Sequence, residues 1–141
     1  LGFVQVLDEH TLAIPDRPGN NRIDSMTNLI DNPKLGLIFL IPGVSETLRI
    51  NGTAEIRDDA ELCQRFEVNG KVPKTVLVIS AKEVFLHCAK ALIRSKLWEE
   101  ASKATERPIP TMSEMIRDQD NMDIPLETET EMRDRYKDVL Y

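Results

Sequence analysis

Apolar segments of strand length follow one another at short spacing through residues 1–98, and only brief helical segments separate them. In residues 47–57 apolar and polar side chains alternate, and Gly52 interrupts the apolar face, which is typical of a bulge or a close backbone approach. Because successive strands lack full crossover helices, the pattern favours an antiparallel barrel over a parallel doubly wound sheet. We therefore predict a mainly β fold.

The predicted strands are residues 3–7, 11–14, 35–41 and 47–57, followed by residues 75–80 and 83–87, which form one long bent strand or two short ones. A helix is predicted between the second and third strands, capped by Asn20 or Asn21 and ended by Asn32-Pro33. A capping box of Asp58 and Glu61 predicts a second, shorter helix. Since a closed barrel needs about one strand more, we expect another strand before Leu1.

Residues 101–141 differ from the rest, because they hold no glycine and carry ten acids against six bases. We expect a barrel domain over residues 1–100 and a charged helical extension over residues 101–141. Two amphipathic helices are predicted from Met112, Met115 and Ile116, and from Met132, Tyr136, Val139 and Leu140. We expect these helices to pack on the barrel or on a partner subunit, since their acidic polar faces would be repelled by anionic lipid.

The composition excludes several classes of function. The chain has 141 residues and a formal charge of −6, so a broad basic surface for nucleic acid or anionic lipid is not expected. No apolar run is long enough to span a bilayer and no signal peptide is evident, which predicts a cytoplasmic protein. Cys63 and Cys88 are expected to be reduced, buried thiols. With two histidines and no cysteine cluster, no metal site is expected.

The loop of residues 16–25 is the first candidate site. It leads from a strand end into a helix start, where free backbone N–H groups and the helix dipole attract anions. The side chains that could add donors there are Arg17, Asn20, Asn21, Arg22 and Ser25. A simple capped helix with two solvated arginines is the competing interpretation, because the glycine-rich fingerprint of a nucleotide-binding fold is missing.

Residues 84–98 are the second candidate, because they hold one histidine and three bases without any acid. Lys90 and Arg94 are four residues apart and would share a helical face. Their positive charges could then bind one anion together. These bases could equally pair with the acidic extension or with a partner subunit. We interpret His87 as a hydrogen-bonded, partly buried ring in preference to a catalytic base. We interpret Trp98 as a packing residue.

Side chains with catalytic chemistry of their own are hard to identify in this sequence. The serines lack a nucleophile-elbow context, and the carboxylates are scattered. The sequence therefore assigns no catalytic residue. If the protein is an enzyme, a bound cofactor is expected to supply the reactivity.

Two stretches resemble the pyridoxamine 5′-phosphate oxidase-like FMN-binding proteins, over residues 1–120. They are LAIPDRPGNNRIDSMTNLIDNPKLGLIFLIPGVSETLRINGTAEI and VFLHCAKALIRSKLW, which contain the D-R-P-G-N-N-R and H-C-A-K-A motifs of one subgroup. The resemblance implies an antiparallel split β-barrel of Greek-key type that forms a homodimer, with one FMN in each of two clefts at the subunit interface.

The resemblance also implies which residues hold the flavin. Its phosphate would lie against Arg17, Asn20, Asn21, Arg22 and Ser25, in the loop already proposed for an anion. The strand that contains Thr47 and Arg49 would lie beside the flavin ring. Residues His87, Lys90 and Arg94 would complete the cleft.

Two departures from the family pattern bear on the reaction. The true oxidase has a basic residue at the end of its first flavin-contacting strand, where this chain has Leu7-Asp8. The Arg-x-His pair associated with the oxidase's substrate is replaced by His87-Cys88-Ala89-Lys90. We therefore expect an FMN-dependent oxidoreductase acting on an unknown small molecule. The alternatives are a non-catalytic flavin or haem carrier or sensor, and a structural dimer without ligand.

Overall fold

The computed structural model describes residues 3–137 and divides into two compact units. The sheet unit is Leu1–Trp98, and the helical unit is Glu99–Tyr141. No helix of the described residues is both long and apolar enough to cross a membrane.

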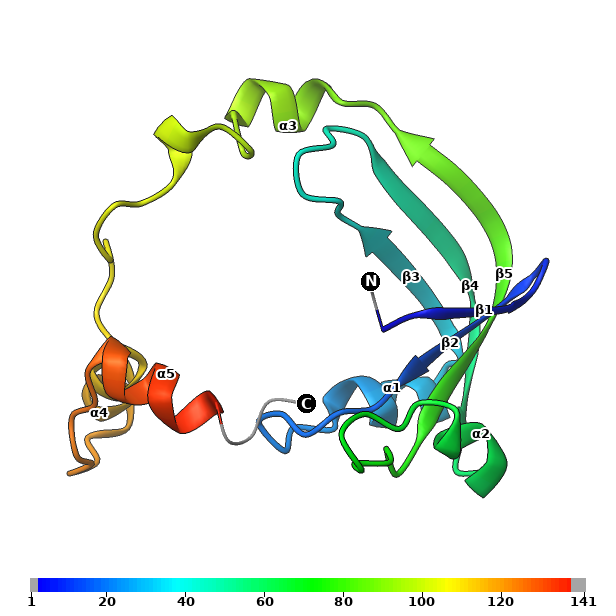
Figure 1. The fold of residues 1–141 in the computed structure, drawn as a ribbon, viewed down its shortest axis with the longest axis horizontal. Helices are drawn as coiled ribbons and strands as arrows, with labels where there is room; N and C mark the ends of the chain where they lie inside the picture. The colour runs from blue at the N-terminus through cyan, green and yellow to red at the C-terminus, as the bar shows by residue number, and fades with distance from the viewer. Residues whose placement is uncertain (1–2, 138–141) are drawn as a thin grey trace. The chain divides into compact units, whose positions relative to one another are not determined.

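The sheet unit contains one five-stranded sheet in the order β1-β2-β5-β4-β3, in which every neighbouring pair is antiparallel (Figure 1). The strands are β1 (Gln5–Asp8), β2 (Thr11–Pro15), β3 (Lys34–Phe39), β4 (Thr47–Arg57) and β5 (Val76–His87). The mainly β, antiparallel fold class is thus confirmed. Of the two options for residues 75–87, the single long, bent strand is correct.

Gly52 lies where β4 and β5 slip in register, because Asn51 faces Glu83 whereas Gly52 faces Ala81. A Cβ atom on Gly52 would lie 2.1 Å from the backbone oxygen of Ser80, which cannot move without disturbing the ladder. The predicted bulge and the predicted close backbone approach are therefore both present. The bulge bends the two longest strands and lets them curve around one side of the core.

The sheet unit has three short helices: α1 (Asp24–Asp31) connects β2 to β3, α2 (Ala60–Gln64) connects β4 to β5, and α3 (Lys90–Ser95) follows β5. The predicted caps are wrong for the first two, since neither has a side-chain cap hydrogen bond. At α1 the Asn20 amide oxygen accepts from the N–H of Arg22 at 3.0 Å, so it closes the loop instead. At α2 the carboxylate of the N-cap Asp59 is occupied by the Arg57 guanidinium, with both N–O distances 2.7 Å.

The core of the sheet unit lies where α2 and its flanking loop cover β2 and the start of β5. Its clustered side chains are Ala13, Cys63, Phe66 and Val76. Further along the sheet, Ile50, Ala54 and Ile79 are also buried. Both cysteines are free thiols, but only Cys63 is buried. The prediction that Cys88 is buried is wrong, because it follows the end of β5, where the chain leaves the sheet.

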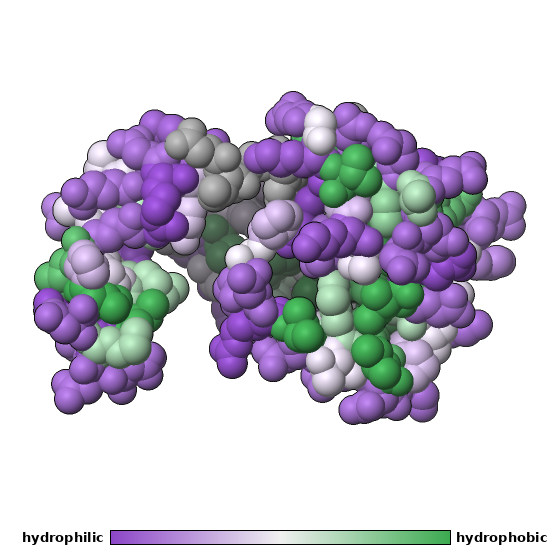
Figure 2. All heavy atoms as spheres, turned by 90° about the horizontal axis from the view of Figure 1, so that it is seen from below, coloured by the Kyte–Doolittle hydropathy of each residue, from purple (hydrophilic) through white to green (hydrophobic). Residues whose placement is uncertain are grey.

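The helical unit holds the two predicted helices, α4 (Met112–Asp120) and α5 (Glu129–Lys137), together with a 3-10 turn, η1 (Glu100–Ser102). Val139 and Leu140, predicted for the second helix, lie outside the described residues. Over Glu99–Lys137 no residue is buried. Figure 2 shows an apolar patch on this unit surrounded by hydrophilic side chains. Met112, Ile116, Met132 and Tyr136 are among the residues that line a cavity of about 320 Å³ there.

Candidate functional site

A cavity of about 510 Å³ lies beside the start of α1, and we call it the α1 cavity. One wall is the loop from β2 into α1, and the other is the segment that leads into β5. Its lining residues are Asp16, Arg17, Pro18, Gly19, Asn20, Asn21, Arg22, Ile23, Ser25, Met26, Val72, Pro73, Lys74 and Leu77. The volume lies within the range of roughly 300–1,000 Å³ that is usual for small-molecule sites.

All five residues predicted for an anion in the loop of residues 16–25 line this cavity, namely Arg17, Asn20, Asn21, Arg22 and Ser25. Three cations, Arg17, Arg22 and Lys74, face a single lining carboxylate, Asp16. The remaining wall is largely apolar, with Met26 and Leu77 among its members. A site of this composition suits a ligand that combines an anionic group with an apolar body.

The loop of the α1 cavity has a defined backbone shape. Asn21 adopts a left-handed conformation with φ +59°, which asparagine tolerates better than most residues. Because α1 has no side-chain cap, the N–H groups of its first turn are open to a ligand. The Arg22 guanidinium lies 3.4 Å from the Asp24 carboxylate, and both side chains are three-quarters exposed. That pair is weak and leaves Arg22 able to turn toward an anion.

Arg17 serves the cavity differently from the other predicted residues. Its Nη1 donates to the backbone oxygen of Lys71 at 3.2 Å, and its Nη2 donates to the backbone oxygen of Phe66. The backbone N–H of Asp16 donates to the oxygen of Thr75 at 2.9 Å. These bonds tie the two walls of the α1 cavity together. Arg17 therefore shapes the cavity, and its terminal donors are directed at carbonyl groups.

The second wall, including Val72, Pro73 and Lys74, was missed by sequence reasoning. No local pattern could have revealed it, because these residues lie about 50 positions from the loop and reach it only through the pairing of β2 with β5. The sole hint in the sequence was a lysine directly before a predicted strand. The same sheet pairing brings Pro15 opposite Val76 and thus sets the two walls side by side.

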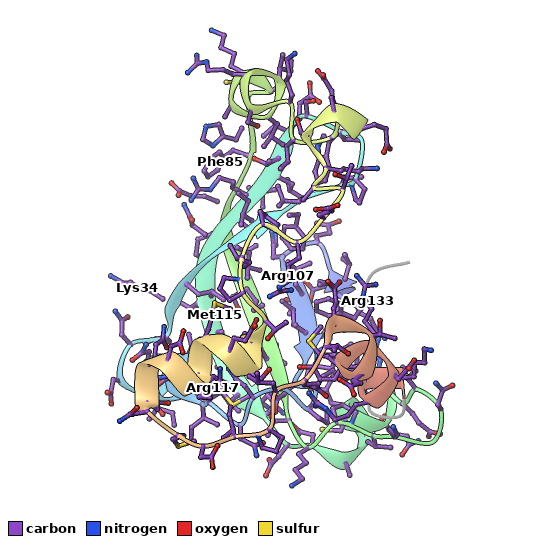
Figure 3. The ribbon with its side chains drawn as sticks, turned by 90° about the vertical axis from the view of Figure 1, so that its left-hand side faces the viewer. Lys34, Phe85, Arg107, Met115, Arg117 and Arg133 are labelled. Atoms are coloured by element: carbon purple, nitrogen blue, oxygen red, sulfur yellow. The ribbon has the colours of Figure 1, made fainter. Side chains whose placement is uncertain are left out.

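Three other predicted residues meet at the opposite end of the β4–β5 ladder. Thr47 pairs with His87, and Arg49 pairs with Phe85, so that all four side chains share one face of the sheet. We call these four residues the ladder-end group. The Arg49 guanidinium lies 5.9 Å from the centroid of the Phe85 ring, within range of a cation–π contact. Figure 3 places Phe85 near the α3 end of the sheet.

Arg49 is the most unusual member of the ladder-end group. Its Nε atom is buried and has no hydrogen-bond partner among the described residues. Thr47 is also buried, at 7% exposure. A buried donor without an acceptor costs roughly 1–3 kcal/mol, so this position suits a ligand that brings an acceptor. His87 is exposed, so the prediction of a partly buried ring is wrong, and Lys90 and Arg94 on α3 are exposed as well.

The two groups of predicted residues do not meet within one protomer. The α1 cavity lies near the Arg57–Val76 end of the ladder, whereas the ladder-end group lies at the Thr47–His87 end. Ten residue steps along β4 separate those ends, which at about 3.3 Å a step is roughly 30 Å along the strand, and less in a straight line because the bulge at Gly52 bends it. A molecule that contacted both groups on one chain would have to extend along most of β4.

Titratable groups with shifted pKa values do not gather at either place. Asp8 has a lowered pKa because the N–H of His10 donates to its carboxylate at 2.8 Å, which makes it a turn residue of the β1–β2 hairpin. Among the described residues, no group of three or more His, Cys, Asp or Glu side chains is placed to hold a metal ion.

A family model described as pyridoxamine 5′-phosphate oxidase matches residues 1–88. Among solved structures, HupZ of Group A Streptococcus is 25% identical, covering 60% of this chain and 68% of its own, with a TM-score of 0.45. A Lactobacillus delbrueckii protein described as a candidate pyridoxamine 5′-phosphate oxidase is 22% identical, with the same coverages and a TM-score of 0.44. These scores are too low to support a functional argument. No curated protein matches the chain.

Proposed function

Because the chain belongs to the pyridoxamine 5′-phosphate oxidase family, we propose that it is an FMN-binding flavoprotein that exchanges electrons with a small molecule. The observation that carries this proposal is the α1 cavity, where all five residues predicted for the flavin phosphate line one space of about 510 Å³. A phosphomonoester carries a charge of about −1.5 to −2 near neutral pH. The excess of cations over carboxylates in the lining suits such a group.

The residues present fit FMN at both of its ends. At the phosphate end, Arg22 and Ser25 supply side-chain donors, and the open first turn of α1 supplies backbone donors. At the ring end, the buried and unpartnered Nε of Arg49 suits an acceptor on the edge of an aromatic ring system. The Arg49–Phe85 contact holds that guanidinium in place.

The proposal includes a homodimer, and two observations support this assembly. The separation of roughly 30 Å along β4 between the α1 cavity and the ladder-end group favours an arrangement in which one flavin uses the two from different protomers. In addition, Val84, Leu86 and Ile93 are 60%, 72% and 63% exposed. Exposed apolar side chains gathered at one end of a sheet are typical of an interface.

When bound, FMN would supply the capacity to accept or release a hydride. The chain's own part is to bind and orient. Arg22, Ser25 and the α1 start would fix the phosphate, while Arg17 would keep the two cavity walls at their spacing. Thr47 and Arg49 would orient the acceptor edge of the ring. Lys90 and Arg94, both exposed on α3, would contact the phosphate or an anionic substrate.

A second candidate function is a non-catalytic carrier or sensor of flavin or haem on the same fold. One observation favours it: the position where the oxidase has a basic residue is occupied here by Asp8, which serves the hairpin turn. A carboxylate bound to its own backbone adds no cation to the cleft. Turnover therefore has to be measured separately from binding.

The visible absorption spectrum of the purified protein tests FMN binding directly. A bound flavin gives its characteristic visible band, and the flavin released on denaturation should be FMN. Multiple cycles of bleaching and recovery under NADPH and a panel of small oxidisable or reducible molecules would support an enzyme. Binding without any turnover would favour the carrier. A protein that neither retains nor takes up flavin would overturn the proposal.

The substitution Arg22→Ala tests the phosphate assignment. A hydrogen bond to a charged group is worth about 1.5–3 kcal/mol, so the FMN dissociation constant should rise roughly ten- to a hundredfold. The matched control is Lys34→Ala, which removes one cation at the start of β3 and outside the cavity lining. Figure 3 shows Lys34 projecting away from the sheet. Equal FMN affinity in the two variants would contradict the assignment of Arg22.

A further inference from the structure

Lys74 lines the α1 cavity from the wall opposite Arg22 and Ser25. Its ammonium makes no hydrogen bond or ion pair within residues 3–137, although the chain as a whole is rich in carboxylates. Asp16, the cavity's lining carboxylate, does not pair with it. Lys74 is exposed, so its unpaired ammonium can turn toward any anion that enters the cavity.

The backbone around Lys74 is fixed from both sides. Pro73 before it is buried, and Thr75 after it accepts the N–H of Asp16 at 2.9 Å. The oxygen of Lys74 itself faces the buried Cys63 thiol, with a sulfur–oxygen distance of 3.7 Å. Arg17 anchors the same segment through the oxygens of Phe66 and Lys71. The flexible side chain therefore extends from a rigid wall, and little backbone order would be lost when it binds a ligand.

The side chains that can bond a phosphate directly show why a second cation beside Arg22 would matter in this cavity. A phosphomonoester carries about −1.5 to −2, and Arg22 brings a single positive charge that it shares with Asp24. Arg17 keeps its positive charge and adds to the potential of the cavity, but its Nη1 and Nη2 atoms donate to carbonyl oxygens and are not placed to bond a phosphate. Lys74 is the remaining cation of the lining.

We propose that Lys74 is the specificity-determining residue of the α1 cavity, the second cation that makes it selective for a phosphomonoester over the same ligand without phosphate. This inference rests on the proposed function for the identity of the ligand, FMN, but its chemistry is that of any phosphomonoester. Lys74 and Arg22 would hold the phosphate from opposite walls. The apolar lining would accept the remainder of the ligand and would not distinguish the two forms.

The test compares Lys74→Gln with Lys71→Gln in the full chain. Both variants remove one positive charge from the same segment, but only Lys74 belongs to the cavity lining. Binding of FMN and of riboflavin, which lacks the phosphate, is measured for each by flavin fluorescence. For Lys74→Gln we expect the FMN dissociation constant to rise about tenfold and that of riboflavin to change by less than about twofold. For Lys71→Gln both should change by less than about twofold, since an outlying charge is screened by salt.

Two results would overturn the role of Lys74: equal FMN affinity in the two variants, or an equal loss of FMN and riboflavin in Lys74→Gln. Failure of the proposed function has a different signature, because the unmodified protein would then bind neither flavin. In that case inorganic phosphate is titrated by calorimetry into the same three proteins. Weaker phosphate binding in Lys74→Gln alone supports the inference, whereas equal binding or none refutes it. The fluorescence of Trp98 verifies that each variant is folded.

Discussion

The two units of this chain are stabilised by different forces. The sheet unit holds all the buried residues of the described chain and has 12 acids and 12 bases, so its formal charge is zero. The helical unit has no buried residue over Glu99–Lys137, and with 12 acids and six bases it carries the whole charge of −6. Apolar burial therefore dominates the first, and polar contacts at helix ends dominate the second.

The difference explains where each unit keeps its function. A ligand cavity needs walls that do not move, and the α1 cavity is built on β2 and β5, which pair at the buried centre of the sheet unit. In the helical unit the ordered contacts are carboxylates bound to helix starts and arginines, such as Glu127 with Arg135 at 2.8 and 2.7 Å. These contacts are exposed and respond to pH and salt.

The chain offers one optical probe for each unit. Trp98 is the single tryptophan and lies in the sheet unit, where its Nε1 donates to the oxygen of Val44 at 2.8 Å. Both tyrosines, Tyr136 and Tyr141, belong to the helical unit. Tryptophan fluorescence and the near-ultraviolet signal of tyrosine can therefore follow the two units in the same intact protein.

The largest expected effect is that of Gly52→Ala on the sheet unit. The added methyl group would lie 2.1 Å from the oxygen of Ser80, a contact with backbone that forces β4 and β5 apart. We expect a loss of about 3 kcal/mol or more in the free energy of unfolding followed by Trp98. The control is Gly43→Ala, where φ is +85° but no atom lies within 4 Å of the added carbon. Gly52 is not among the glycines with positive φ, so an equal loss in both variants would contradict a dominant cost of the close approach.

A smaller effect, confined to the helical unit, is expected on acidification. The pKa of Glu114 is lowered from 4.5 because the N–H of Thr111 donates to it, and that of Glu131 is lowered by the N–H of Thr128. Arg135 and Arg133 lower the pKa values of Glu127 and Glu129. A lowered pKa in the folded state means stability that is present above the unfolded value and lost as the pH falls through the folded one. Helix content should therefore fall below about pH 4.5.

The measurement is an acid titration followed by circular dichroism, tyrosine signal and Trp98 fluorescence. Two carboxylates of the sheet unit also have lowered pKa values: Asp8, bound by its hairpin turn, and Asp59, bound by Arg57. Both lie at the periphery, so the Trp98 signal should change at a lower pH than the tyrosine signal. A single acid transition shared by all three signals would contradict the view that apolar burial stabilises the sheet unit and polar contacts stabilise the helical unit.

The sequence predicted the sheet unit well because strand periodicity is a local signal. Residues 47–57 were predicted as β4 without error in their bounds, and the bulge at Gly52 followed from one interruption of the pattern. The helix cap predicted at Asp58 lies one residue from the observed N-cap Asp59, whose carboxylate is bound by Arg57 and does not cap the helix. The predicted domain boundaries, packing of the extension and site roles remain predictions.

The candidate site was predicted only in part, for the same physical reason. The loop of residues 16–25 is contiguous, so its side chains could be recognised together. Lys74 and its wall reach the α1 cavity through sheet pairing, which a single sequence does not reveal. Arg17 was assigned to phosphate because its charge is visible in the sequence, whereas its carbonyl partners at Phe66 and Lys71 are not.

The smallest effect is expected from substitution of Thr111. This substitution tests the difference between the two units most directly, because it changes one helix end and no packing. Thr111 Oγ1 accepts from the N–H of Glu114 at 3.3 Å, while the Glu114 carboxylate accepts from the N–H of Thr111 at 2.6 Å. Thr111→Ala removes the first of these bonds and should cost about 1 kcal/mol in the helical unit. Thr111→Ser keeps the hydroxyl and should restore it. Thermal unfolding should then shift in the tyrosine signal and in helix content, with the Trp98 transition unchanged. If the unfolding transition followed by Trp98 shifts together with that followed by Tyr136, the two units unfold as one. Apolar burial and helix capping would then not stabilise separate units.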